Sequence, residues 1–382
     1  MEIKREITVP RSSFFLFGPR GTGKSTYVKS LIDEHTLYID FLDPVTFRTY
    51  AAFPETLIET VNAANPSRII IDEVQKVPQI LEVVHKIMED QKIHFILTGS
   101  GARKLKKAGA DLLGGRAAYC KMHPFTASEL GDTFSLTRAL QTGMIPVVER
   151  SMEPVSTLSA YVDIYLREEI MAEGLVRNLG SFARFLEIVS FSHGAVLNVS
   201  NLARECQVSR GIVTGYLDIL NDLLLSYELP VFSHRAKRKT AVHPKFYLFD
   251  NGLYRRLRQR GPLDTESEIS GPALEGLVGQ HIRAYADFQL NDARLFYWRS
   301  QAGNEVDFVL YGGETFVALE VKNTKVIRPV DYHGLSSFGD DYPEASLILV
   351  YRGNLLMKHK NILVIPVESF LKDPGRYLGE RN

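Results

Sequence analysis

The stretch from Phe14 to Asp40 reads FFLFGPRGTGKSTYVKSLIDEHTLYID. Its apolar start, Phe14 to Phe17, predicts a buried strand, and residues Ser25 to Ile32 predict a helix. Between them lies GPRGTGKS, which fits the pattern G-x-x-x-x-G-K-[ST] in the context of strand, loop and helix that a P-loop requires. Backbone N–H groups of such a loop turn inward around a phosphate. A glycine-rich turn with a chance lysine is the alternative interpretation.

The P-loop pattern gives its residues individual roles. Lys24 is expected to reach the β- and γ-phosphates of ATP, and Ser25 is expected to bind Mg²⁺. The full set of expected nucleotide-binding residues is Gly18, Pro19, Arg20, Gly21, Thr22, Gly23, Lys24, Ser25, Thr26, Asp72 and Ser100.

A second motif follows in RIIIDE, residues 68 to 73. A β-branched run that ends in two carboxylates is typical of a Walker B strand, buried on both faces of a parallel sheet. Asp72 is then a ligand of Mg²⁺, directly or through water, and Glu73 is the general base that polarises the attacking water. The alternative is a core strand that ends in acids by chance.

Two further features belong to the same half of the chain. The strand HFILTGS, residues 94 to 100, places Thr98 or Ser100 where ligands bind in open α/β sheets, either as a γ-phosphate sensor or as a satisfied strand-end hydroxyl. Arg116 follows Gly114-Gly115 and is a candidate catalytic finger for a neighbouring subunit, with Arg103 as a second candidate. A surface ion pair is the alternative for Arg116.

Composition limits the possible functions. The chain has 382 residues, enough for two or three domains, and a formal net charge of +0, so any nucleic-acid-binding surface has to be local. Its two cysteines, Cys120 and Cys206, are far apart and make a zinc site improbable. The N-terminus has no signal-peptide pattern, and no apolar run has membrane-spanning length, which predicts a cytoplasmic protein without membrane contact.

The middle of the chain predicts a winged helix. Residues 198 to 217 have the pattern of a helix-turn-helix, with Ser200 and Ser209 as helix caps and Ile212 on the inner face of the second helix. Two strands, Tyr227 to Phe232 and Lys245 to Phe249, form the wing. The candidate nucleic-acid contacts are Arg210 on the second helix and, in the loop between the strands, Arg235, Lys237, Arg238 and Lys239. Packing between domains is the alternative, and the small set of polar residues on the helix predicts little sequence specificity.

The C-terminal part carries acids on a hairpin. Because residues two apart on a strand share a face, Glu320 and Lys322 point the same way and Val321 points into the core. With Glu275 on the preceding helix and Asp307 on the adjacent strand, the set resembles the restriction-endonuclease-like fold and its D…E-x-K signature. That resemblance implies a Mg²⁺ or Mn²⁺ site at Glu275, Asp307 and Glu320, with Lys322 assisting catalysis. An inactive nucleic-acid-binding scaffold and a protein-binding module stay open, as does the role of Glu305.

Taken together, the motifs GPRGTGKST, RIIIDEVQKVPQ, FILTGSGARKL, LLGGRAA and HPFTASEL resemble the AAA-type ATPases of bacteria and archaea that carry a C-terminal domain of unknown function 4143. The resemblance extends over essentially the whole chain and implies a Mg²⁺–ATP site.

The expected fold is α/β. A P-loop ATPase with a parallel sheet occupies residues 1–150, a helical and winged-helix region occupies 151–265, and a small nuclease-like α/β domain occupies 266–382. The expected function is a magnesium-dependent ATPase that acts on DNA with a C-terminal nuclease domain, working as a homo-oligomer. The alternative is an ATP-switched DNA- or protein-binding regulator whose nuclease fold is inactive.

Overall fold

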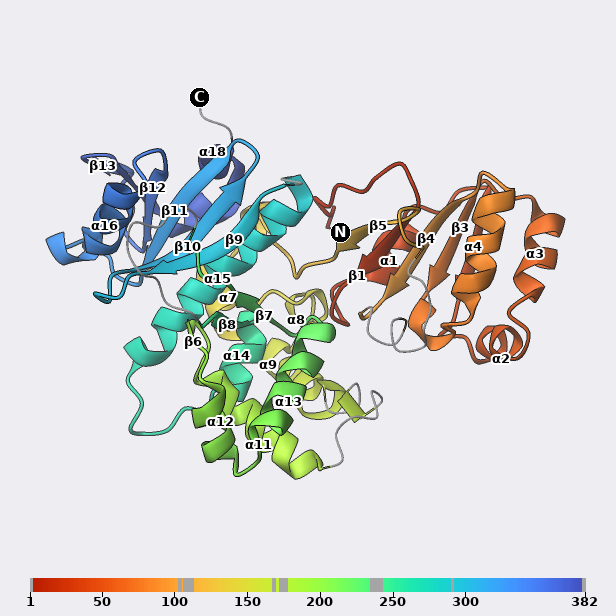
Figure 1. Cartoon of the computed structure of the whole chain (residues 1–382), viewed down its shortest axis with the longest axis horizontal. Coiled ribbons are helices and arrows are strands. Elements are labelled where there is room, and N and C mark those ends of the chain that lie inside the picture. Colours follow the sequence, from red (N-terminus) through yellow and green to blue (C-terminus); the bar gives the residue numbers. More distant parts are fainter. Residues whose placement is uncertain are drawn as a thin grey trace. The chain divides into compact units, whose positions relative to one another are not determined.

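The computed structural model describes residues 3–101, 105, 113–166, 170–171, 178–233, 243–289 and 292–379. The chain forms two compact units (Figure 1). The P-loop unit comprises Arg5–Pro124 and Ile219–Leu225, and the C-terminal unit comprises Met1–Lys4, Phe125–Asp218 and Ser226–Asn382.

The P-loop unit is built on a parallel five-stranded sheet with the order β2-β3-β4-β1-β5. This confirms the predicted α/β class. Its elements are β1 (Phe14–Phe17), α1 (Lys24–Lys29), β2 (Thr36–Asp40), α2 (Pro44–Ala52), α3 (Thr56–Ala64), β3 (Arg68–Asp72), the 3-10 turn η1 (Val74–Lys76), α4 (Ile80–Asp90), β4 (His94–Gly99) and β5 (Ala118–Lys121).

Burial explains why these segments are strands. All four residues of β1 are buried, as are Ile69, Ile70 and Ile71 of β3, so these central strands are covered on both faces. The chain leaves β1, β3 and β4 at the same edge of the sheet, because parallel strands all run in one direction. That edge therefore gathers the P-loop, the two acids Asp72 and Glu73 at the end of β3, and the hydroxyls at the end of β4.

The first part of the C-terminal unit is mainly helical and includes a small antiparallel sheet with the order β6-β8-β7. Its elements are α6 (Ala127–Leu130), η2 (Gly131–Thr133), α7 (Leu136–Thr142), α8 (Pro146–Glu149), α9 (Pro154–Ala160), the π-helix η3 (Tyr161–Leu166), α11 (Leu179–Ser190), β6 (Ala195–Val196), α12 (Val199–Cys206), α13 (Arg210–Asp222), β7 (Ser226–Leu229), β8 (Lys245–Leu248) and α14 (Asn251–Leu257).

The rest of the C-terminal unit is a six-stranded mixed sheet with the order β13-β14-β12-β11-β10-β9, preceded by the long helix α15 (Figure 1). Strands β9, β10 and β11 are antiparallel neighbours, whereas β11, β12 and β14 run parallel. The elements are α15 (Glu266–Gln289), β9 (Arg294–Arg299), β10 (Glu305–Gly312), β11 (Thr315–Lys322), η4 (Pro329–Tyr332), α16 (His333–Asp341), β12 (Ser346–Tyr351), β13 (Met357–His359), β14 (Ile362–Pro366), α17 (Val367–Lys372) and α18 (Gly375–Leu378).

One hydrophobic core joins the parts of the C-terminal unit. Phe125 of the first segment, Tyr247 of the small sheet and Val317 of the large sheet belong to the same buried cluster. The backbone N–H of Ala127 also donates to Nε2 of the buried His281 on α15, at 2.9 Å. These contacts explain why the chain joins the C-terminal unit again at Phe125. The predicted division of residues 151–382 into two domains remains a proposal.

Two details of α12 and α13 differ from the sequence prediction. Asn198, not Ser200, caps α12, because its side chain accepts the backbone N–H of Asn201. Ile212 is 43% exposed rather than part of the inner face, since α13 turns Val213, Tyr216 and Leu217 inward instead. The predicted cap at Ser209 is present, with Oγ 3.4 Å from the N of Ile212.

Residues that follow β7 enter the core of the large sheet. Phe232 is buried, and its ring lies 5.2 Å from the rings of both Tyr311 and Tyr342. The backbone N–H of Phe232 donates to the O of Tyr297 on β9, at 2.7 Å. The small sheet is thereby fixed to the large one by side-chain packing and by backbone hydrogen bonds.

We expect Phe232→Ala to destabilise the C-terminal unit by about 3–5 kcal/mol, since it leaves a cavity among aromatic rings. Urea unfolding followed by fluorescence measures this, because the single tryptophan, Trp298, lies in the same cluster. Phe191→Ala is the control: that ring is exposed and lies against the guanidinium of Arg258, so its loss should cost about 1 kcal/mol or less. Equal costs for the two variants would contradict the prediction.

Candidate functional site

The P-loop joins β1 to α1 at the carboxyl edge of the parallel sheet. A side chain at Gly18 would place its Cβ 2.5 Å from the O of Met122, so only glycine fits there. Gly23 has a φ of +90° at the N-terminus of α1, a conformation that favours glycine. The fold thus favours glycine at positions 18 and 23 for steric and conformational reasons, in agreement with the P-loop pattern.

The lysine of the motif lies within the loop. Lys24 is buried, and its Nζ donates to the O of Gly18 at 2.7 Å and to the O of Pro19 at 3.2 Å. Arg5 supports the loop from outside the motif, donating to the O of Thr22 at 2.8 Å and to the O of His123 at 2.7 Å. Sequence reasoning missed Arg5, because the first residues of the chain have no recognisable pattern.

The acid that ends β3 is held by two hydroxyl groups. Asp72 is fully buried and accepts hydrogen bonds from the hydroxyl of Tyr38, at 2.9 Å, and from Oγ1 of Thr98. Burial and then the charge of Asp72 raise the pKa of Tyr38, which keeps that hydroxyl a donor. Thr98 therefore serves as a partner of Asp72.

The second acid has an unusual backbone conformation. Glu73 has a φ of +60°, in the left-handed region that few non-glycine residues adopt. Its N–H donates to Oγ1 of Thr98 at 3.1 Å, which fixes the turn between β3 and η1. Such strain persists only where the surroundings enforce it, and it is often found at functional sites.

A glutamine connects the second acid with the end of β4. Nε2 of Gln75 donates to Oε2 of Glu73 at 2.5 Å and to Oγ of Ser100 at 3.3 Å. Gln75 is buried on the one-turn helix η1, two residues after Glu73. The sequence analysis did not identify Gln75, although its position shortly after Asp72 and Glu73 could have indicated a role at the site.

The two candidate fingers have different outcomes. Nη2 of Arg116 lies 2.9 Å from Oε1 of Glu89, and the arginine side chain is 42% exposed. His85 contacts the same carboxylate oxygen at 3.2 Å. The ion pair that was the alternative interpretation is present, while the role of Arg116 in a neighbouring subunit remains a prediction. Arg103 lies outside the described residues.

The acids of the C-terminal unit surround a lysine that the sequence prediction did not include. Nζ of Lys245, on β8, lies 3.0 Å from Oε1 of Glu275, 2.5 Å from Oε1 of Glu305 and 3.1 Å from Oδ1 of Asp307. The lysine side chain is only 2% exposed. Tyr247, two residues later on the same strand, donates to Glu275 at 2.5 Å. We call Lys245, Glu275, Glu305 and Asp307 the lysine-centred cluster.

Electrostatics keep this lysine charged. Burial alone would lower the pKa of Lys245, but the carboxylates of Glu275, Asp307 and Glu305, with the Tyr247 hydroxyl, raise it well above its usual value. Burial, followed by the charge of Asp307, raises the pKa of Glu275 to about 7. The ammonium of Lys245 thus supplies the positive charge that lets several carboxylates be buried together.

The E-x-K pair lies beside the lysine-centred cluster. Nζ of Lys322 is 2.5 Å from Oε1 of Glu320, and the backbone N–H of Val321 donates to Oδ2 of Asp307 at 2.9 Å. Oε2 of Glu320 is buried and has no hydrogen-bond partner among the described residues. Burial and the nearby Asp307 raise the pKa of Glu320 well above its usual value.

This geometry does not fit the divalent ion that the D…E-x-K resemblance implies. The Lys245 ammonium lies within 3.1 Å of carboxylate oxygens from Glu275 and Asp307, two of the three expected ligands. In the described part of the chain, no group of three or more His, Cys, Asp or Glu side chains is arranged to hold a metal ion. The sequence thus correctly brought Glu275, Asp307, Glu320 and Lys322 into one region, but an internal ammonium accompanies them.

The candidate nucleic-acid contacts are only partly observed. Arg210 is exposed at the start of α13, together with Thr214 and Asp218 on the same helix. Arg235, Lys237, Arg238 and Lys239 lie outside the described residues. Separately, none of the described helices combines the length and hydropathy of a membrane span.

Comparison with known families divides the chain into three matched segments. The AAA domain family matches residues 10–131, a domain of unknown function (DUF8612) matches residues 135–264, and a domain of unknown function (DUF4143) matches residues 270–370. The chain carries an AAA domain and a DUF4143 domain. The AAA match covers the P-loop, Asp72, Glu73 and Arg116, and the DUF4143 match covers Glu275, Asp307 and Glu320.

Individual relatives are distant. An uncharacterized protein of Haemophilus influenzae is 22% identical over 268 residues, which cover 62% of this chain and 67% of that protein. The Orc1 protein of Aeropyrum pernix, solved in complex with DNA, is 12% identical over 70% of this chain and 87% of its own. Its TM-score of 0.25 is too low to establish a shared fold.

We expect Lys245→Met to destabilise the C-terminal unit by about 3–5 kcal/mol, because it leaves the buried Asp307 and the partly buried Glu275 and Glu305 without their cation. The change is read from urea unfolding followed by Trp298 fluorescence. Lys325→Met is the matched control: this lysine is exposed, and its replacement should alter stability by no more than about 0.5 kcal/mol. A Lys245→Met chain as stable as the unmodified one would show that the cluster does not depend on the ammonium.

Proposed function

We propose that this chain is a magnesium-dependent ATPase that switches a DNA-binding C-terminal unit, and that its nuclease-like domain binds without cutting. The observation that carries the first part is the meeting of Lys24, Asp72 and Glu73 at one edge of the parallel sheet, inside the segment matched by the AAA domain family. The observation that carries the second part is the ammonium of Lys245 among the acids.

The residues of the P-loop unit have distinct roles in the proposed hydrolysis. The loop N–H groups and Lys24 bind the phosphates, so Lys24 exchanges its contacts with the carbonyls of Gly18 and Pro19 for phosphate oxygens. Ser25 and Asp72 would hold the Mg²⁺ ion, which neutralises charge on the transferred phosphoryl group. The hydroxyls of Tyr38 and Thr98 orient Asp72 for this task.

Glu73 takes the proton of the attacking water. Its carboxylate is bound by Gln75, which also contacts Ser100. Gln75 is therefore a positioning residue: it holds the base and connects it to the hydroxyl at the end of β4, where a γ-phosphate is expected. A shift of Ser100 would be transmitted to Glu73 through one side chain.

The proposal that the C-terminal domain binds without cutting rests on charge. A metal-dependent nuclease needs carboxylates that are free to bind a cation. Here Asp307 contacts Lys245 through one oxygen and the N–H of Val321 through the other, and Glu275 contacts both Lys245 and Tyr247. Cleavage remains the second candidate function, because Glu320 and Lys322 retain the E-x-K arrangement beside Asp307.

DNA is the proposed partner of the C-terminal unit. The element order α11, β6, α12, α13, β7, β8 and the antiparallel sheet β6-β8-β7 support a winged helix with α13 as the recognition helix. Its exposed Arg210 suits a phosphate contact, and the few polar residues on the helix favour low sequence specificity. A homo-oligomer is proposed because Arg116 would then reach a neighbour's nucleotide.

The ATP proposal predicts two separable defects. Lys24→Ala should abolish ATP binding, whereas Glu73→Gln should keep binding and reduce kcat by about 100-fold or more, because only the general base is lost. Binding is measured with a fluorescent ATP analogue and turnover by phosphate release. Glu82→Gln, at an exposed acid on α4, is the control and should behave like the unmodified chain. Unchanged turnover in the Glu73→Gln chain would exclude Glu73 as the base.

The C-terminal proposal predicts that metal has no effect on this unit. In the absence of nucleotide, Mn²⁺ should leave the Trp298-monitored unfolding transition unshifted, and neither linear nor circular DNA should be cut with Mg²⁺ or Mn²⁺. DNA binding should persist in the Asp307→Asn chain, since no metal bridge is lost. If the unmodified chain cuts DNA with Mn²⁺ while Asp307→Asn and Glu320→Gln chains do not, the domain is a nuclease and the proposal is wrong.

A further inference from the structure

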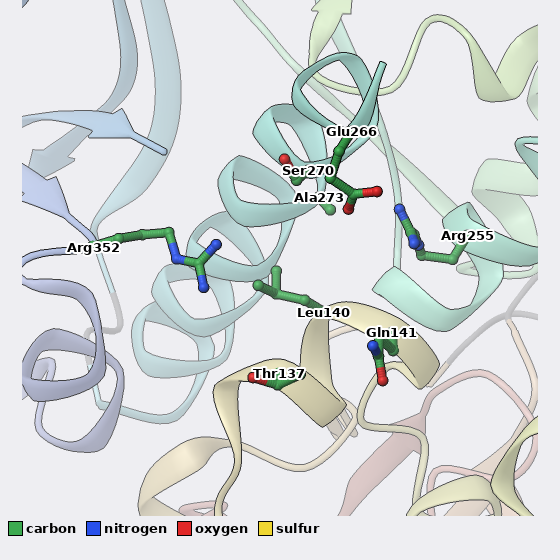
Figure 2. A pocket seen from close by; sticks show the side chains of 8 residues that line it. All are labelled: Thr137, Leu140, Gln141, Arg255, Glu266, Ser270, Ala273 and Arg352. Carbon is green, nitrogen blue, oxygen red and sulfur yellow. The ribbon is translucent and has the colours of Figure 1, made fainter. Parts of the chain in front are cut away.

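A small pocket lies within the C-terminal unit, and none of the site residues discussed above lines it. It is formed by α7, α14, α15 and the residue that follows β12, and its volume is about 120 Å³. Figure 2 shows Arg352 and Arg255 on opposite sides of the pocket, with Leu140 between them. Leu140 and Ala273 supply apolar surface, while Thr137, Gln141 and Ser270 add polar groups.

Arg255 differs in its ion pairing from the arginines that follow it closely in the sequence. The chain from 255 to 260 contains four arginines. Three of them contact a carboxylate: Arg256 pairs with Asp163, Arg258 with Asp264 and Arg260 with Glu266. The fourth, Arg255, lines the pocket, and the described residues include no carboxylate within ion-pair distance of it or of Arg352. Neither guanidinium group of the pocket therefore has a carboxylate counter-ion in the part of the chain that the structure describes.

Hydrogen bonds hold one side of the pocket in place. Nδ2 of Asn323 donates to Oγ of Ser270 at 2.7 Å, and Nη1 of Arg352 lies 3.4 Å from Oδ1 of the same asparagine. Because Oγ of Ser270 already accepts a hydrogen bond, its own hydrogen is available as a donor, and no acceptor for it occurs in the described part of the chain. Arg352 and Ser270 therefore present donors from a preorganised frame.

The one acid at the pocket has its own partner. Oε2 of Glu266 lies 2.9 Å from Nη1 of Arg260, a residue that does not line the pocket. This ion pair offsets the charge of Glu266. The net charge of the remaining lining residues, Arg255 and Arg352 among them, is positive.

We propose that this pocket binds a phosphate group, either inorganic phosphate or a small phosphomonoester. Two guanidinium groups on opposite sides match the double negative charge of phosphate, and arginine forms forked hydrogen bonds to its oxygens. The hydroxyl groups of Ser270 and Thr137 add donors suited to the remaining oxygens. A volume of about 120 Å³ is well below the roughly 300–1,000 Å³ typical of pockets for larger ligands, which favours a small ligand such as a phosphate group.

Calorimetric titration of the full-length Lys24→Ala chain tests this proposal, because that substitution removes phosphate binding at the P-loop. Inorganic phosphate should bind, and Arg255→Gln and Arg352→Gln should each raise its Kd by about tenfold or more, since each removes a charged donor. Arg256→Gln removes the same charge from the adjacent position, which pairs with Asp163 outside the pocket, and should leave the Kd within about twofold. Unchanged Trp298-monitored unfolding confirms that each variant is folded.

A parallel titration with glycerol phosphate distinguishes the two sources. Tighter binding of the ester assigns the site to a phosphomonoester, and equal or weaker binding assigns it to free phosphate; both results support the proposal. Succinate has two negative charges but no phosphate geometry and should bind at least about tenfold more weakly. No phosphate binding, a Kd that ignores Arg255→Gln and Arg352→Gln, or equal binding of succinate would each overturn the proposal.

Discussion

The C-terminal unit depends on one buried positive charge. A cluster of acids on α15 and β10 would be strongly unfavourable in the interior without a cation, and Lys245 supplies it from β8. Since β8 also pairs with β6 and β7, the same strand belongs both to the small sheet and to the acid cluster. The small sheet and the large sheet are therefore coupled by charge as well as by the shared hydrophobic core.

Much of the P-loop unit could be predicted because the sequence patterns that define it are local. Each motif is a short contiguous segment, and parallel strands necessarily bring their carboxyl ends to one edge, so Lys24, Asp72 and Ser100 could be assigned to one site from the sequence. The contacts between motifs were not predictable in the same way. That Thr98 binds Asp72 depends on β3 and β4 being neighbours in the correct register, which no single segment encodes.

The C-terminal unit shows where local reasoning fails. Strand alternation correctly placed Val321 in the core and put Glu320 beside Lys322. Strand alternation could not identify Lys245. This residue lies 62 residues before Asp307, and in the sequence it resembles an ordinary polar residue at the start of a strand. Its role follows only from the docking of β8 against α15 and β10, a consequence of tertiary packing. All residues of the D…E-x-K signature are present, but the ammonium of Lys245 gives them an electrostatic environment that differs from that of a metal site.

The chain crosses from one unit to the other at more than one point. The chain passes between them after Lys4, Pro124, Asp218 and Leu225. The third of these points lies inside α13, which begins at the exposed Arg210 and ends at Asp222 within the P-loop unit. In the proposed function, α13 is therefore the element whose integrity should matter for coupling ATP hydrolysis to DNA binding, because its residues are divided between the two units.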